Sequence, residues 1–169
     1  MDRAVERERG HRRLPVARRL SSDGHKVKVL DGDALRKKVS KDLGFSKKDR
    51  MEHIRRAALL ASELTHKGYF VLAALISPYR LSREAARRTI GSFIEIHTRC
   101  PLSVCEKRDR KGMYRQARKG NIKKFTGVSD IYEAPSGAEI VLDTHRMTIR
   151  SCVKKTLDYL RCQKHIPVV

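Results

Sequence analysis

Short apolar runs with the pattern of strands alternate along this chain with amphipathic stripes of helical period. The strand pattern occurs in four segments, namely 26–30, 70–76, 93–97 and 139–143, and each is followed by a helical segment. Strands that alternate with helices in this way favour a parallel sheet covered by helices on both faces. No internal repeat is visible, and 169 residues suit a single domain. The fold class that we predict is therefore α/β.

The helical stripes are defined by their apolar spacing. From Asp49 onward the spacing i, i+3, i+4, i+7 is kept by Met51, Ile54, Ala58, Ala61 and Leu64, and Gly68 stands at a typical C-terminal position. The last stripe carries Ile149, Val153, Thr156, Leu157 and Leu160, with Cys152 beside them as a core residue. The continuous run from Phe70 to Ile76 predicts a strand buried on both faces.

The chain is strongly basic, and this limits its partners. It has 39 Lys and Arg against 19 Asp and Glu, a formal net charge of +20. Such an excess favours anionic ligands. Aromatic residues are only 5% and Trp is absent, so a stacking platform for single-stranded nucleic acid is poorly supplied and a nucleic-acid partner is not favoured.

Targeting and metal signals are not evident in the sequence. The longest apolar run, Tyr69 to Ile76, is too short to span a membrane, and the first residues contain no apolar signal core. We therefore expect a cytoplasmic protein without a membrane partner. The four cysteines form no C-x-x-C pair and the seven histidines are scattered. We therefore predict no metal-ligating residues and no zinc site.

Polar residues gather where the predicted strands end. Asp31 and Asp33 follow the first strand, and Ser77 follows the second. Ligands of parallel α/β sheets bind outside the carboxyl ends of the strands, so these side chains suit a phosphorylated ligand. The D-G-D string alone is weak evidence, because Asp-Gly is most common in turns.

A basic stretch from Lys107 to Lys124 contains nine Lys and Arg and one acid, Asp109. Two interpretations stay open on composition alone. The stretch is either a solvated helical face or a mobile lid that closes cations over phosphates, with Gly112 and Gly120 as hinges.

Several linked strings resemble the adenylylsulfate kinase (APS kinase) family. They are VLDGDALR, DLGFSKKDRMEHIRR, ISPYR, PLSVCEKRDRKGMYRQARKGNIKKFTGV and EIVLDT, in the family's order and spacing. The resemblance implies a P-loop-kinase-like domain over residues 21–169, preceded by a non-matching basic segment, residues 1–20. It also implies transfer of the ATP γ-phosphoryl to the 3′-hydroxyl of adenosine 5′-phosphosulfate (APS).

The resemblance also implies roles for particular residues, position by position. Asp31 and Asp33 match catalytic carboxylates near magnesium, and Ser77 matches a phosphoserine position that also contacts substrate. The implied substrate-binding residues are Arg36, Phe45, Arg50, His53, Ile76, Ser77, Lys111 and Phe125, and Arg108 is implied near the ATP adenine. ATP and Mg²⁺ are the expected co-substrate and cofactor. A homodimer and an ATP sulfurylase are the expected protein partners.

The chain departs from the family pattern at three places. Ala34 and His53 stand where the family has Asn, and the first strand with its glycine-rich Walker A loop has no counterpart. The segment that aligns with this region, residues 1–11, contains no lysine and one glycine, Gly10. The lost loop leaves an APS-binding regulatory module without catalysis as one alternative function. The net charge of +20 gives the other, a basic nucleic-acid-binding protein.

One hypothesis explains the unusual start of the chain. The residues MDRAV can be encoded by codons that, read one nucleotide later, give W-T-G-L-S, the opening of the family's Walker A region. The N-terminal segment would then be an out-of-frame translation or the result of a misplaced start, and the coding DNA decides this.

Overall fold

The computed structural model describes residues 14–109 and 111–167, which form two compact units. The described part of the first unit comprises residues 14–77 and Leu81–Phe93, and that of the second comprises Pro78–Arg80 and residues 94–167 without 110. Most of the non-matching N-terminal segment lies outside the described residues. No helix within the described ranges is long and apolar enough to cross a membrane.

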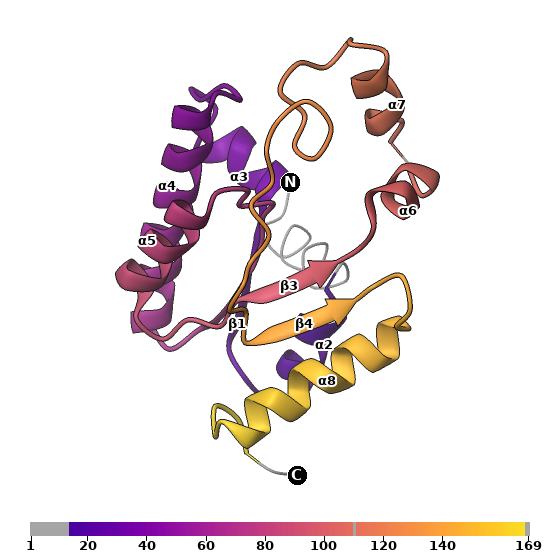
Figure 1. Ribbon diagram of the computed structural model, residues 1–169. Coiled ribbons are helices and arrows are strands. Elements are labelled where there is room, and N and C mark those ends of the chain that lie inside the picture. Colours follow the sequence, from indigo (N-terminus) through magenta and orange to yellow (C-terminus); the bar gives the residue numbers. More distant parts are fainter. Residues whose placement is uncertain (1–13, 110, 168–169) are drawn as a thin grey trace, which may run out of the picture. The chain divides into compact units, whose positions relative to one another are not determined.

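The first unit contains a pair of parallel strands with helices around it (Figure 1). Its elements are α2 (Pro15–Ser22), β1 (Val27–Asp31), α3 (Gly32–Lys38), α4 (Lys47–His66), β2 (Phe70–Ala74) and α5 (Arg80–Ile90), the last beginning at the border of the two units. Strands β1 and β2 pair in register from Val27 beside Phe70 to Asp31 beside Ala74. Both strands therefore end at the same edge.

Small side chains of α4 let this helix pack closely on the strand pair. Ala57 and Ala61 form a buried cluster with Leu30 of β1 and Leu35 of α3. On the neighbouring side of α4, buried Ile54 and Ala58 meet Ala86 of α5. These clusters fix α4 against the strands that carry the predicted site, because close-packed interiors resist displacement.

The second unit repeats the same strand–helix pattern. Its elements are β3 (Ile96–Arg99), α6 (Leu102–Lys107), α7 (Met113–Arg118), β4 (Ile140–Asp143) and α8 (Ile149–Cys162). Strands β3 and β4 are parallel, with Ile96 beside Ile140 and Arg99 beside Asp143. Helix α8 runs along β4 (Figure 1). Its Leu157 and Leu160 are buried, as are Ile140 and Leu142 of β4.

The structure confirms the α/β class and the four strands, and it corrects several details. Within the described residues the parallel pairs are β1–β2 in the first unit and β3–β4 in the second. The expectation that β2 is buried on both faces is wrong: its residues are half-buried or exposed, because β1 is its one strand neighbour among the described residues. The prediction that Cys152 is a core residue is also corrected, since it is half-buried.

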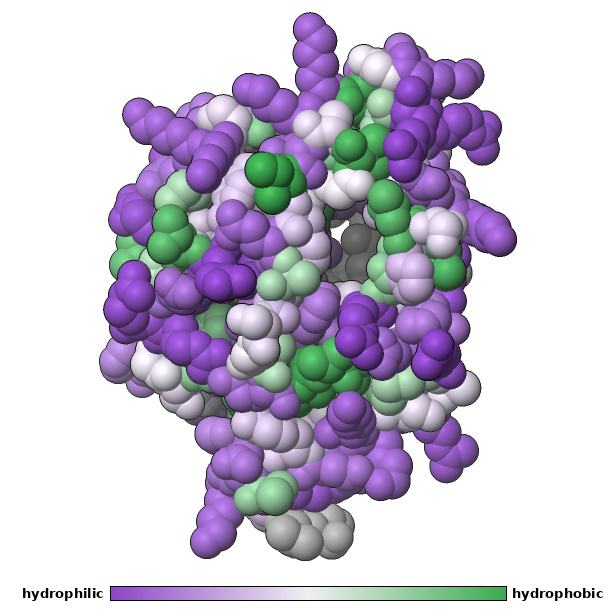
Figure 2. All heavy atoms as spheres, in the orientation of Figure 1, coloured by the Kyte–Doolittle hydropathy of each residue, from purple (hydrophilic) through white to green (hydrophobic). Residues whose placement is uncertain are grey.

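The start of one strand and the exposure of one helix residue also differ from the sequence prediction. Strand β3 begins at Ile96 and not at Phe93, because Phe93 packs against the α4–α5 cluster and lies under the guanidinium of Arg87. Ile149 was expected on the apolar face of the last helix but is exposed in its first turn. On the face drawn in Figure 2, hydrophilic residues predominate and apolar residues form small patches.

Helix α4 begins at a capping box. The Ser46 hydroxyl accepts the N–H of Asp49, and the Asp49 carboxylate in turn accepts the N–H of Ser46. This pair satisfies two of the backbone donors that every helix start leaves without an intrahelical partner.

Replacing Ser46 by alanine is expected to lower the free energy of unfolding by about 1 kcal/mol, the usual effect of losing an N-cap. Urea unfolding followed by circular dichroism measures this change. Ser46→Thr keeps the hydroxyl and serves as the matched control. An unchanged midpoint in Ser46→Ala would contradict the capping role.

Candidate substrate-binding site

The D-G-D string begins a helix, which corrects the turn interpretation. Asp31 is the N-cap of α3, and its Oδ1 accepts the N–H of Ala34 at 3.0 Å. Gly32 lies close to β2: a Cβ at this position would meet the carbonyl oxygen of Ala74 at 3.2 Å. Asp33 is exposed in the first turn of α3. Both carboxylates therefore stand at the positive end of a helix, where negative charge is favoured.

Two guanidinium groups lie near the ring of Phe45. The Arg36 guanidinium lies 4.8 Å from the ring centroid of Phe45, and that of Arg50 lies 5.5 Å from it. Arg50 is buried, and its Nε donates to the carbonyl oxygen of Phe45 at 3.2 Å. The Phe45 residue is 60% exposed. The arrangement presents a flat apolar surface flanked by two cations, which suits an aromatic base carrying an anionic group.

The positions of both guanidiniums are fixed by backbone carbonyls. Nη1 of Arg36 donates to the carbonyl oxygen of Gly44 at 2.6 Å and to that of Leu43 at 3.3 Å. Partial burial and the nearby charge of Arg50 lower the pKa of Arg36. An anion bound beside them would relieve this repulsion.

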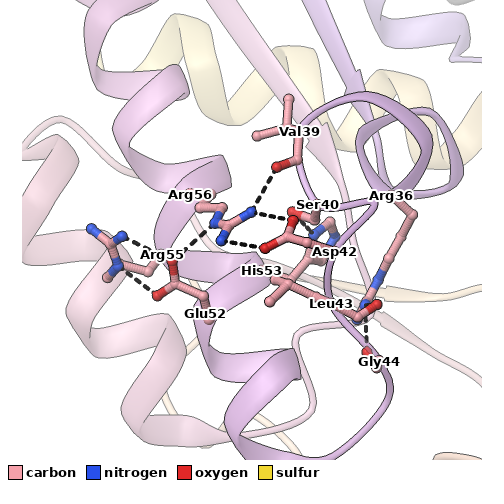
Figure 3. A network of polar contacts seen from close by, with 10 residues as sticks. All are labelled: Arg36, Val39, Ser40, Asp42, Leu43, Gly44, Glu52, His53, Arg55 and Arg56. Carbon is pink, nitrogen blue, oxygen red and sulfur yellow. Dashed lines mark hydrogen bonds and ion pairs between the residues drawn. The ribbon is translucent and has the colours of Figure 1, made fainter.

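His53 lies on α4 and is only 6% exposed. Its Nδ1 is 2.9 Å from the hydroxyl oxygen of Ser40, which is also buried (Figure 3). Burial, followed by the charges of Arg36 and Arg56, lowers the pKa of His53 below its usual value near 6.5. The imidazole is therefore neutral at pH 7, and its contact in the described structure is with the chain segment that leads to Phe45.

The neutral state of His53 predicts a pH-dependent stability. Since the unfolded histidine has a pKa near 6.5 and the folded one a lower pKa, the unfolded chain binds more protons below about pH 6.5. The stability contributed by His53 is present above that pH and is lost as the pH falls toward the folded pKa, by at most about 1.4 kcal/mol per pH unit.

Urea unfolding at several pH values between about 5.5 and 7.5 measures this slope, above the range in which ordinary carboxyl groups titrate. His53→Asn is expected to remove the His53 part of the slope. His66→Asn, which replaces an exposed histidine of the same helix, is the matched control for the substitution. Equal slopes for wild type and His53→Asn would contradict the assignment.

The segment after β2 has a strained backbone. Ser77 has a φ of 43°, a left-handed value that is costly for residues other than glycine. Its carbonyl oxygen accepts a hydrogen bond from Nη1 of Arg83, a buried residue of α5, at 2.8 Å. Ile76, just before it, is 65% exposed. Strain held by a buried arginine at a strand end is typical of a functional position.

The remaining predicted residues belong to the second unit. Arg108 donates from Nη1 to the carbonyl oxygen of Thr144 at 3.1 Å. Phe125 meets Tyr114 edge to face, with centroids 5.0 Å apart. Lys111 is exposed and precedes Gly112. The substrate and nucleotide roles of Arg108, Lys111 and Phe125 remain predictions.

The basic stretch begins at the last residue of the short helix α6 and contains the short helix α7. Gly112 and Gly120, the expected hinges, have φ values of 67° and 78°, which suit glycine at the two ends of α7. Nη2 of Arg118 pairs with Oε1 of Glu106 at 2.7 Å and so joins α7 to α6. Both interpretations of the stretch, lid and solvated face, remain predictions.

The structure brings together the predicted residues of the first unit in two groups. The first group is the cluster of Arg36, Phe45 and Arg50, next to His53. The second group is Asp31 and Ser77: Asp31 is the last residue of β1 and lies beside Ala74, the last residue of β2, and Ser77 follows β2. Sequence reasoning missed Arg56, which joins α4 to the segment before Phe45. The Glu52–Arg56 spacing of four residues was the available signal. Among the described residues, no group of three or more His, Cys, Asp or Glu could hold a metal ion.

Parallel strands followed by helices, with carboxylates after the first strand, define an α/β fold whose ligands bind outside the carboxyl ends of the strands. The family model of adenylylsulphate kinase matches residues 13–143, and the chain belongs to this family. The adenylyl-sulfate kinase of Synechococcus sp. (strain JA-2-3B'a(2-13)) is 47% identical over 151 residues, 89% of this chain and 86% of that protein. The resemblance drawn from the motifs is confirmed.

Solved structures agree with this assignment. The Mycobacterium tuberculosis APS kinase in complex with AMPPNP and APS has a TM-score of 0.83 and 37% identity, over 86% of each chain. The hexameric APS kinase from Thiobacillus denitrificans has a TM-score of 0.65 and 29% identity, over 90% of this chain and 26% of that one.

Proposed function

We propose that this chain catalyses the reaction of its family, transfer of the γ-phosphoryl of ATP to the 3′-hydroxyl of APS. In this reaction the bond from the γ-phosphorus to the β–γ bridging oxygen breaks and a bond to the 3′-oxygen forms. The products are 3′-phosphoadenosine 5′-phosphosulfate and ADP. Family membership supports the reaction. The observation that carries the proposal is the cluster of Arg36 and Arg50 at the Phe45 ring.

The acceptor side of the reaction is assigned to the first unit. The exposed face of Phe45 stacks on the adenine of APS, because an aromatic ring accepts any base on its π-face. Arg36 and Arg50 bind the phosphosulfate oxygens, since the planar guanidinium matches such oxygens in pairs. Ile76 and Ser77 line the same pocket in this proposal. Lys111 and Phe125 keep the substrate-binding roles that the resemblance predicts.

The two aspartates carry the chemistry in this proposal. Asp33 accepts the proton of the 3′-hydroxyl, a task that suits an exposed carboxylate. Asp31 keeps the start of α3 in place through its bond to the N–H of Ala34. A carboxylate pair at a strand end fits magnesium, which takes one or two carboxylates beside phosphates and waters. When bound, the ion would offset the charge that develops on the transferring phosphoryl group.

A second candidate function is binding of APS without turnover. The observation that favours it is the sequence before β1: residues 1–25 contain no lysine and no glycine-rich string, and within the described part α2 occupies Pro15–Ser22. The phosphates of ATP need backbone N–H groups and a cation. The two candidates share the acceptor site and differ only in phosphoryl transfer.

A coupled assay of ADP formation separates the two candidates. With APS, ATP and magnesium together, the kinase proposal predicts ADP release that depends on APS, and adenosine 5′-phosphate in place of APS serves as the control. Heat released on APS binding without ADP formation would support the binding module. A protein that neither binds APS nor forms ADP would contradict both candidates.

The assembly state also remains a proposal. The family resemblance predicts a homodimer and an ATP sulfurylase as partner. Light scattering of the purified chain measures its mass directly, and a mass of about 19 kDa, that of one chain, would contradict the dimer.

A further inference from the structure

The loop of residues 39–45 joins α3 to α4 and carries Phe45 at its end. Two of its carbonyl groups, those of Leu43 and Gly44, hold the guanidinium of Arg36. The position of this loop therefore sets both the ring and one of the two cations of the APS cluster.

Arg56 of α4 contacts this loop through both terminal nitrogens of its guanidinium group (Figure 3). Nη1 donates to the carbonyl oxygen of Val39 at 2.9 Å and to Oδ1 of Asp42 at 2.6 Å, while Nη2 donates to Oδ2 of Asp42 at 2.8 Å. The pair with Asp42 is bidentate. Such forked pairs fix geometry as well as adding binding energy.

The Arg56 side chain is itself oriented from within α4. Its Nε donates to Oε1 of Glu52 at 2.9 Å, and Glu52 also pairs with Arg55. Hydrogen bonds from Arg55 and Arg56 lower the pKa of Glu52 to about 2, so this carboxylate stays ionised at neutral pH. One turn earlier on α4, His53 contacts Ser40 of the same loop. Two side chains of one packed helix thus hold the first half of the loop.

A single exposed ion pair contributes little to stability, and the Asp42 side chain is 55% exposed. Arg56 differs from such a pair because three of its nitrogen–acceptor contacts reach the loop and a fourth is anchored on the helix. This arrangement restricts the orientation of the loop more than it strengthens the fold.

We propose that Arg56 is a positioning residue for APS: through Val39 and Asp42 it fixes the 39–45 loop so that Phe45 and Arg36 meet the nucleotide. This inference deepens the proposed function and rests on it. Arg56 contacts neither the reacting atoms nor the aspartates in this proposal. Its loss should therefore act on APS recognition and spare the chemical step.

The test compares Arg56→Ala with Arg55→Ala. Arg55 is the neighbouring residue, also pairs with Glu52 and does not reach the loop, which makes it a matched control. For Arg56→Ala we expect the KM for APS to rise at least about ten-fold, since misplacement of binding groups can cost up to about a hundred-fold. We expect kcat and the KM for ATP to stay within about two-fold, the pattern of lost uniform binding. Arg55→Ala should match wild type.

A double-mutant cycle shows whether the effect runs through Asp42. Asp42→Ala is expected to raise the KM for APS as Arg56→Ala does, and the double variant should add little, because the two residues form one contact. Additive losses would overturn the proposed route, and so would equal losses in Arg55→Ala and Arg56→Ala.

Hydrogen exchange gives a readout that does not need APS. The N–H of Leu43 donates to the carbonyl oxygen of Ser40 within the loop, so its exchange reports the order of the loop. Arg56→Lys, a milder variant that keeps the charge, should speed exchange at Leu43 at least about ten-fold and leave α4 unchanged. Unchanged exchange would overturn the inference even if the wild type turned over APS. A lack of APS binding by the wild-type protein would contradict the proposed function. The exchange rate at Leu43 would still show whether Arg56 orders the loop.

Discussion

Asp33→Asn is expected to lower kcat by at least about a hundred-fold, because the amide cannot accept the proton of the 3′-hydroxyl and such proton transfer contributes about 10²–10⁴-fold. The substitution keeps the size of the side chain at an exposed position in the first turn of α3. The affinity for APS should therefore change by less than about three-fold, since the binding groups are elsewhere.

Steady-state kinetics and calorimetric titration with APS measure these two effects on Asp33→Asn. Glu63→Gln serves as the control, because Glu63 is an exposed carboxylate of α4 that pairs with Lys67. Retention of wild-type kcat in Asp33→Asn would contradict the role of Asp33. Equal losses of kcat and APS affinity would instead make it a binding residue.

Phe45→Ala is expected to weaken APS binding by about ten-fold to a hundred-fold, since stacking of a base on an aromatic side chain contributes about 1–3 kcal/mol. The loss has a second source. Arg36 and Arg50 both lie against the ring, so its removal takes away the surface that aligns the two cations.

Calorimetric titration with APS tests this prediction, with Phe45→Tyr as the conservative variant that should bind nearly as well as wild type. Leu59→Ala is the control, an exposed apolar residue on α4 that lies outside the cluster. Unchanged affinity in Phe45→Ala would remove Phe45 from the site.

Many of the arginines that make this chain basic serve the fold. Their donors bind backbone carbonyls: Arg36 at Leu43 and Gly44, Arg50 at Phe45, Arg56 at Val39, Arg83 at Ser77, Arg87 at Phe93 and Arg108 at Thr144. The +20 charge therefore indicates less about anionic partners than composition alone suggests. Part of the positive excess is used to fix loop geometry.

The sequence predicted the elements whose pattern is local. The four strands and the stripe of α4 follow from period and from the apolar residues that it buries, and the motifs placed Phe45, Arg36 and Arg50 in one site. Features that depend on tertiary contacts were not predictable. Phe93 left its strand for the α4–α5 cluster, and Ser77 took a left-handed backbone with its carbonyl held by Arg83.

The Asp31–Gly32 pair shows why local chemistry alone misled. A preference for turns is correct for Asp-Gly on average. Here the Asp31 side chain accepts the N–H of Ala34, and the same residue becomes the cap of α3. Likewise, the contact of His53 with Ser40 joins positions thirteen residues apart, which no short-range pattern reveals.

The central claim is tested most directly by following the phosphoryl group itself. Purified chain is mixed with APS, magnesium and ATP labelled in its γ-phosphoryl, and the nucleotides are separated and identified. The account predicts that the label appears on the 3′-oxygen of 3′-phosphoadenosine 5′-phosphosulfate, and that Asp33→Asn slows its appearance. Label that stays in ATP while APS is bound would contradict catalysis by this chain and leave it an APS-binding module.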